Sequence, residues 1–197
     1  RLSGGKQTPV VAVPNLPTGI VSVPASTSFK VSLNETQGSC VFAFATITGL
    51  ISCWAPSLDN FNAITGYDGS GDGSVYTGLA IDSTNKHMLA ADIVNNRVQI
   101  IDNTWTVIGS FTDPDLPKHY APFNVQILDG KVYVAFTFAR KNRFKHHKGE
   151  GYVDVFDLSG NLQTRLIQNG KLDHPWGLAI APSGFGDISG KLMVGNF

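Results

Sequence analysis

The sequence lacks several features that would point to a membrane or a nucleic-acid partner. No apolar run approaches the roughly 20 residues that a membrane-spanning helix needs. Only 15% of the residues are charged, against roughly 25% in an ordinary soluble domain. Lys plus Arg and Asp plus Glu balance at 15 each, so no net field attracts nucleic acid or an anionic membrane surface. The composition argues against these two partner classes.

Helix signals and the common catalytic motifs are missing as well. No segment combines an apolar stripe at i, i+3, i+4 and i+7 with end caps, which argues against an α-helical fold. The sequence holds no G-x-S-x-G, no phosphate-binding loop, no H-E-x-x-H and no C-x-x-C, and each absence removes a familiar enzyme class. We therefore expect no cofactor, and the sequence favours a protein that is not an enzyme.

What the sequence has is one phrase restated four times. The copies are LPTGIVSVP, VYTGLAID, YAPFNVQIL and HPWGLAIAP, and they align on Gly19, Gly78, Asn124 and Gly177 at spacings of 59, 46 and 53 residues. Short strands that recur at roughly 40–50 residues are typical of propeller blades. The innermost strands of such blades approach one another closely, which favours small residues. The phrase therefore predicts strands that crowd around a shared axis.

The segments between the copies predict an all-β β-propeller with four-stranded blades. Period-2 patterns such as RVQIID and GYVDVFD predict half-buried strands, with Asp154 and Asp157 facing solvent. About three and a half blades are present, whereas closed rings use four to eight, so we expect a fragment of a longer chain or closure by another subunit. The expected blade cores are 17–66, 75–112, 121–168 and 175–197, and residues 1–14 are expected to supply the outer strand of a preceding blade.

The stretch LAADIVNNRVQIID resembles the NHL repeat, and GYVDVFDLSGNLQTRLI and PWGLAIAPSGFGDISGKLMVGNF are similar to an uncharacterised family of secreted propellers from bacteria and fungi. The resemblance covers most of residues 39–197. It implies a six-bladed ring with further blades outside this chain, and export, since some members carry a surface-sorting tail. It brings no activity with it.

Two local features favour a secreted or cell-surface setting. Cys40 and Cys53 flank two strands that turn at 46–49, which brings them near each other. They form either a disulfide or two buried thiols. Asn34 begins the sequon N-E-T in a segment that reads as a polar loop, where it is a candidate glycosylation site. Disulfides and N-glycans both belong to an oxidising, extracellular environment.

Two sets of oxygen-bearing side chains are candidate metal ligands. Asp68 and Asp72 alternate with serines as in the start of a calcium loop, although a flexible polar connector would read the same way. Asp92, Asn124 and Asn196 lie at strand ends or at the inner-strand start. They would hold a divalent ion over the channel in a lactonase-type hydrolase; alternatively, Asp92 and Asn196 would bind backbone N–H groups in turns.

A basic loop offers the one candidate anion site. It contains Arg140, Lys141, Arg143 and Lys145 and is either an anion-binding surface or a solvated loop. The leading interpretation is a non-catalytic extracellular binding or scaffold propeller, with a protein or glycan partner or self-association, and without nucleic acid. The alternative is the metal-dependent lactonase or esterase with Ca²⁺ in its channel.

Overall fold

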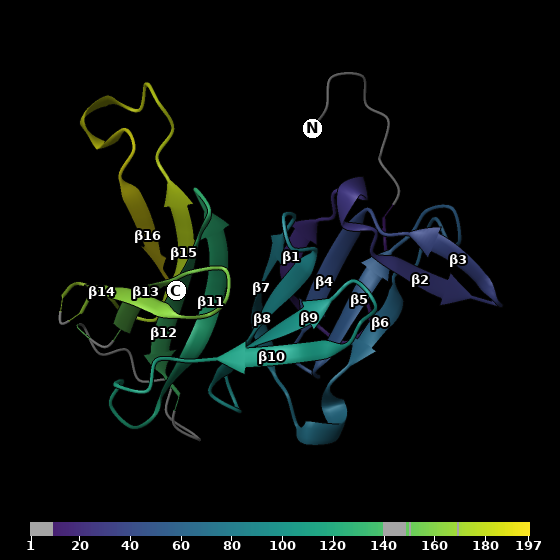
Figure 1. Ribbon diagram of the computed structural model, residues 1–197, viewed down its shortest axis with the longest axis horizontal. Helices are drawn as coiled ribbons and strands as arrows, with labels where there is room; N and C mark the ends of the chain where they lie inside the picture. Colours follow the sequence, from purple (N-terminus) through teal and green to yellow (C-terminus); the bar gives the residue numbers. More distant parts are fainter. Residues whose placement is uncertain (1–9, 140–148, 150, 169) are drawn as a thin grey trace.

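A computed structural model describes residues 10–139, 149, 151–168 and 170–197 of the chain (Figure 1). Throughout these residues the protein is all-β, with sixteen strands and three single-turn 3-10 helices but no α-helix. The 3-10 helices are Ala25–Thr27, Ser70–Asp72 and Gly186–Ile188. No helix in this part of the chain has the length and apolar character to cross a membrane.

Three four-stranded antiparallel sheets and a two-stranded sheet follow one another along the chain. The first contains β1 (Pro17–Ser22), β4 (Phe42–Thr46), β5 (Leu50–Trp54) and β6 (Ile64–Asp68). The second contains β7 (Tyr76–Asp82), β8 (His87–Asp92), β9 (Arg97–Asp102) and β10 (Val107–Phe111). The third contains β11 (Tyr120–Leu128), β12 (Lys131–Phe138), β13 (Gly151–Phe156) and β14 (Leu162–Ile167). The last pairs β15 (Pro175–Ile180) with β16 (Leu192–Asn196).

The first strand of each sheet is its inner strand, and these strands lie side by side. β1 contacts β7, β7 contacts β11, and β11 contacts β15, while the remaining strands of each sheet extend outward in chain order (Figure 1). This is the blade arrangement of a propeller, and the predicted all-β propeller fold is confirmed.

Alternation along the strands explains how the blades hold together. In β8, Met88 and Ala90 face the core shared with the first blade, whereas Leu89 and Ala91 face the core shared with the third. A strand inside a blade is therefore buried on both faces, because each face packs on a neighbouring sheet. This corrects one expectation: Asp154 on β13 was predicted to face solvent, and it is fully buried.

A hairpin inserted into the first blade was not predicted. β2 (Lys30–Leu33) pairs with β3 (Thr36–Ser39) through a two-residue turn at Asn34 and Glu35. Both turn residues have positive φ, 48° and 66°, which is the conformation of a type I′ hairpin turn. The segment around Asn34 is thus a turn between strands and not a loop.

Residues 10–14 are the described part of the segment expected to be an outer strand of a preceding blade. They form no strand. Ala12 makes a single parallel bridge to Asn62 in the connector before β6.

Candidate functional site

Each of the four inner strands has a β-bulge at the same place. The ladder shifts register between Pro17 and Gly19 in β1, and the equivalent shift recurs in the other three inner strands. A bulge leaves one residue outside the ladder and re-aims its side chain. The four residues inside these shifts are Thr18, Thr77, Phe123 and Trp176.

These four bulge residues line one pocket of about 330 Å³, together with Pro17 and Phe197. Phe123 and Phe197 meet edge to face with ring centroids 5.9 Å apart. None of the six lining residues is ionisable. We call this the axial pocket, because its walls come from all four inner strands.

Polar side chains beside the axial pocket form hydrogen bonds that join one blade to another. The Thr18 hydroxyl donates to the Tyr76 carbonyl at 2.8 Å, linking the first two inner strands. The indole N–H of Trp176 donates to the Thr77 carbonyl at 2.9 Å, which links β15 to β7. The Asn124 amide donates to the Trp176 carbonyl at 2.5 Å. The pocket therefore offers a mainly apolar wall held in place by fixed hydrogen bonds.

None of the four bulge residues was predicted from the sequence as a site residue. The signal was nevertheless present. In each copy of the repeated phrase the bulge residue stands immediately before the aligned Gly or Asn, as in P-T-G, Y-T-G, P-F-N and P-W-G. It is Thr in the first two copies and aromatic in the last two.

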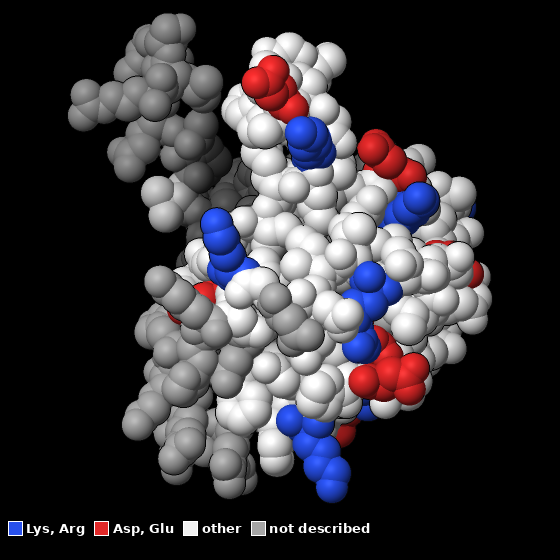
Figure 2. All heavy atoms as spheres, turned by 90° about the vertical axis from the view of Figure 1, so that its left-hand side faces the viewer, with Lys and Arg blue, Asp and Glu red and all other residues white. Residues whose placement is uncertain are grey.

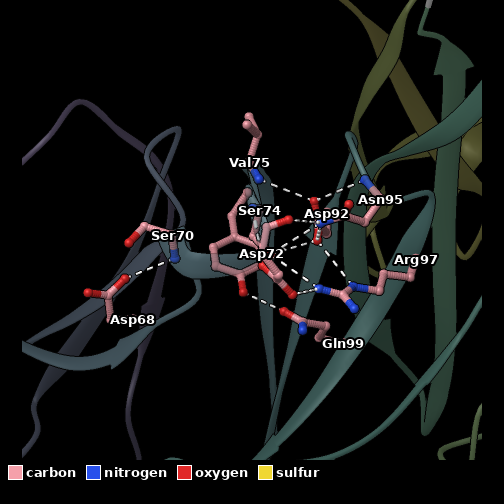
Figure 3. Close-up of polar contacts among 10 residues, drawn as sticks. Asp68, Ser70, Asp72, Ser74, Val75, Asp92, Asn95, Arg97 and Gln99 are labelled. Carbon is pink, nitrogen blue, oxygen red and sulfur yellow. Dashed lines mark hydrogen bonds and ion pairs between the residues drawn. The ribbon is translucent and has the colours of Figure 1, made fainter.

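Asp92, a candidate metal ligand, is committed to a structural network at the end of β8 (Figure 3). Its fully buried carboxylate accepts hydrogen bonds from the Ser74 hydroxyl at 2.9 Å and the Val75 N–H at 3.2 Å. It also accepts from the Asn95 amide at 2.8 Å and from the Arg97 guanidinium at 3.2 Å. The network fastens the connector that enters the second blade to the strands of that blade.

Asp72 joins the same network and Asp68 does not. Asp72 accepts from the Ser74 hydroxyl at 2.6 Å and pairs with Arg97. The Ser74 hydroxyl and then the Arg97 side chain hold the pKa of Asp72 below its usual value. Asp68 accepts from the Ser70 N–H at 2.9 Å and lies apart from the residues around Arg97 (Figure 3). The alternating oxygens therefore do not converge on one point.

Asn196 and Asn124 each have separate partners. Asn196 accepts from the Asp173 N–H at 3.0 Å and donates to the Lys171 carbonyl at 3.1 Å, so it fastens the connector of the last blade as Asp92 does for the second. No hydrogen bond or ion pair joins any two of Asp92, Asn124 and Asn196 within the described ranges. In the same part of the chain, no three His, Cys, Asp or Glu side chains form a group that could hold a metal ion.

Arg165, like Arg97, pairs with two aspartates. This second arginine network lies between the second and third blades and was not predicted from the sequence. Arg165 on β14 pairs with Asp113 in the connector and, at 3.4 Å, with Asp154 on β13. Both carboxyl groups are fully buried, and Asp154 Oδ2 faces no donor. Burial raises the pKa of Asp154 most. The hydrogen bond with Asp113 and the negative charge of Asp113 raise this pKa further, to about 7. One arginine thus pairs with two carboxyl groups, of which Asp154 is still partly protonated at neutral pH.

The cysteines and the sequon lie around the inserted hairpin. Cys40 follows β3, Cys53 lies on β5, and the two are paired as a disulfide with Cα atoms 5.6 Å apart. Asn34 is exposed at the turn of the hairpin. The disulfide thus ties the base of the insertion to the first blade.

The predicted anion site lies outside the described residues, because Arg140, Lys141, Arg143 and Lys145 fall within 140–148. On the described part of the face in Figure 2, Lys and Arg alternate with Asp and Glu among broad uncharged areas. That face therefore carries no large patch of one sign in the part of the chain that can be placed.

Comparison with known proteins shows which proteins the chain resembles in sequence and in fold. No protein-family model matches the chain. Two uncharacterized proteins of Acanthamoeba polyphaga mimivirus are similar to it. One is 25% identical over 181 residues, covering 86% of this chain and 33% of the relative, and the other is 27% identical over 194 residues, covering 93% and 51%. The chain thus spans a third to about half the length of these relatives.

Solved structures with a similar fold are propellers. The WD40 β-propeller domain of Doa1 matches with a TM-score of 0.57 at 12% identity, over 88% of this chain and 47% of that one. Saccharomyces cerevisiae Sqt1 matches with a TM-score of 0.56 at 12% identity, over 89% and 40%. At this identity the likeness shows a WD40-like propeller fold and nothing about ligands. The closer resemblance to NHL repeats stays a prediction.

Proposed function

We propose that this chain is part of a non-catalytic propeller that binds a protein partner by taking an apolar side chain into the axial pocket. The observation that carries the proposal is the composition of that pocket. Four bulge residues from four inner strands line it, none of its lining residues has an acidic or basic side chain, and the hydroxyls of Thr18 and Thr77 donate to backbone carbonyls with no general base beside them in the described part of the chain. Binding sites are typically apolar hollows with a few fixed polar groups.

The rigidity of the pocket supports recognition of a preformed shape. Trp176 and Asn124 are fixed by hydrogen bonds that cross between strands, so little side-chain freedom is lost when a ligand arrives. Tryptophan is enriched among the few residues that supply most of the binding energy at protein interfaces, and Trp176 lines this pocket. The pocket volume, about 330 Å³, suits one large apolar side chain of a partner.

The proposal includes an extracellular or cell-surface setting. It is supported by the pairing of Cys40 with Cys53 and by the exposed sequon at Asn34. Disulfides persist in oxidising compartments. The proposal also includes a larger ring of about six blades, supported by the greater length of the viral relatives.

Selection from a random peptide display library tests the binding function. We expect the selected peptides to share an apolar or aromatic residue. Their affinity should fall at least about tenfold in Thr77→Trp, which fills the pocket, and in Phe123→Ala, which removes one wall. The matched control is Thr164→Trp on the exposed face of β14, which should bind normally.

Two outcomes would overturn the proposal. One is a set of selected peptides whose affinity is the same in Thr77→Trp and in the unaltered chain. The other is EDTA-sensitive hydrolysis of a panel of lactones and aryl esters, which would establish the metal-dependent hydrolase instead.

A further inference from the structure

A second hollow lies on the outer side of the first two blades, far along the sheets from the inner strands. It has a volume of about 590 Å³, within the range typical of small-molecule sites. Three elements line it: the β2–β3 hairpin with Ser28 before it, strand β6, and the turn between β9 and β10. We call it the hairpin groove. It shares no lining residue with the axial pocket.

Trp105 occupies a position in the β9–β10 turn that glycine would normally take. The third blade contains the same turn between β13 and β14. In both turns an aspartate side chain accepts backbone N–H groups two and four residues later. In both, the N–H of the residue three positions after the aspartate donates to that aspartate's carbonyl at 3.0 Å. This residue is Gly160 with φ 85° in the third blade, and Trp105 with φ 64° in the second.

Positive φ is costly for a bulky side chain, so the placement of Trp105 needs a reason in its surroundings. Its indole N–H donates to the Lys30 carbonyl at 2.6 Å, and Phe29 packs edge-on at 5.1 Å between centroids. The ring lies on Gly66, where a Cβ atom would come within 2.5 Å of it. The indole is thus locked in place with its N–H used, and it adds a rigid apolar surface to the groove.

The remaining wall is polar and nearly uncharged. Five exposed side chains there make no hydrogen bond within the described part of the chain. Asn103 also lines the groove and donates its amide N–H to the Thr27 carbonyl at 3.1 Å. Lys30 is the one ionisable lining residue. The five unpaired side chains are Ser28, Lys30, Ser32, Gln37 and Thr65.

This combination selects the chemistry of the ligand. A strongly anionic ligand is normally held by several cations or a bidentate arginine, and the groove has one lysine. A cationic ligand would meet the charge of Lys30, and no carboxylate lines the groove to offset that repulsion. Hydroxyl and amide groups that both donate and accept suit a ligand rich in hydroxyls, while the fixed indole suits the apolar C–H face of a sugar ring. We propose that the hairpin groove binds a neutral saccharide through Trp105 and the hairpin side chains.

Calorimetric titration of the full chain with neutral hexasaccharides tests this proposal. The probes are maltohexaose, cellohexaose, chitohexaose and mannohexaose at millimolar concentration. We expect at least one to bind. Gln37→Ala, which removes an exposed side chain with no internal partner, should weaken that binding about fivefold. Trp105→Gly, which restores the residue type of the Gly160 turn, should abolish it.

The matched control is Gln163→Ala on β14, which should bind within about twofold of the unaltered chain. If circular dichroism shows that Trp105→Gly does not fold, Gln37→Ala and Thr65→Ala decide the question. The proposal is overturned if none of the four saccharides binds to the folded chain. It is also overturned if binding is equal in the groove variants and the control, or if a heparin hexasaccharide binds more tightly than every neutral probe. The peptide experiments on the axial pocket are unaffected by any of these results.

Discussion

A Cβ atom added to Gly78 would lie 2.8 Å from the Cα atom of Asn124 on the neighbouring inner strand. No side-chain rotation relieves a clash with backbone, so only glycine fits at this position. The approach of β7 to β11 at this point is what the repeated phrase of the sequence encodes. The same crowding sets the bulge residues next to one another and so creates the axial pocket.

The buried proton of Asp154 predicts an unusual dependence of stability on pH. The folded chain raises the pKa of this carboxyl group from 3.8 to about 7, so it holds the proton more tightly than the unfolded chain does. The stabilising contribution is therefore fully present below pH 3.8 and is lost as the pH rises to about 7. In Asp154→Asn the amide stays neutral and can still donate to Asp113.

Between pH 4 and pH 7 the unaltered chain should lose this contribution, whereas Asp154→Asn should not. We therefore expect the free energy of unfolding of Asp154→Asn to rise, relative to that of the unaltered chain, by on the order of 2 kcal/mol over this range. Urea denaturation at a series of pH values measures it. Parallel profiles for the two chains would show that Asp154 carries no such proton.

The Cys40–Cys53 bond should contribute measurably to stability. It closes a loop with a sequence separation of 13 residues, for which the loss of unfolded-state entropy corresponds to about 3 kcal/mol. We expect the unfolding midpoint to fall in reducing buffer and in Cys40→Ser. Mass spectrometry after thiol alkylation serves as the control, since the non-reduced chain should take up no label. Equal midpoints with and without reductant would contradict this role.

Asp92 should act as a structural residue and not as a metal ligand. Asp92→Ala would leave the Arg97 guanidinium and the Ser74 hydroxyl without their buried acceptor, at a cost of about 3 kcal/mol. Millimolar calcium or EDTA should not move the thermal midpoint of the unaltered chain. Asp187→Ala is the control and should melt normally, because Asp187 is exposed and its side chain makes no hydrogen bond with any other described residue. A calcium-dependent rise that disappears in Asp92→Ala would restore the metal hypothesis.

The exposed hairpin turn makes Asn34 accessible to glycosylation. When the chain is expressed through a eukaryotic secretory pathway, we expect an electrophoretic shift that a peptide N-glycosidase removes. Thr36→Ala destroys the sequon without changing the residues of the turn, and it should abolish the shift. A secreted chain of unmodified mass would remove this support for an extracellular setting.

The sequence predicted the architecture well because the inner strands impose a local rule. The small residue at Gly19 and Gly78 is required by close backbone approach, and period-2 patterns marked the strands on either side. The turn between Thr46 and Gly49 was also predicted, and the structure places β4 and β5 on either side of it.

The site was harder to predict because it depends on contacts between distant segments. Asp154 alternates with apolar residues as a solvent-facing residue would, and its burial follows from a second sheet packing on that face. Arg165 and Asp113 meet across 52 residues of sequence. The β2–β3 hairpin was not predicted because its strands are short and mostly polar, which is also typical of a loop.

The convergence of the inner strands is tested most directly by comparing two glycines of the repeated phrase. A Cβ atom at Gly177 would come no closer than 3.7 Å to its nearest neighbours. We expect Gly78→Ala to lower the free energy of unfolding by about 2 kcal/mol or more, and Gly177→Ala to change it by less than about 1 kcal/mol. Adding Asn124→Gly to Gly78→Ala should recover part of the loss, because it removes the opposing side chain. Equal effects of the two alanine substitutions, with no coupling between positions 78 and 124, would contradict the convergence of these strands.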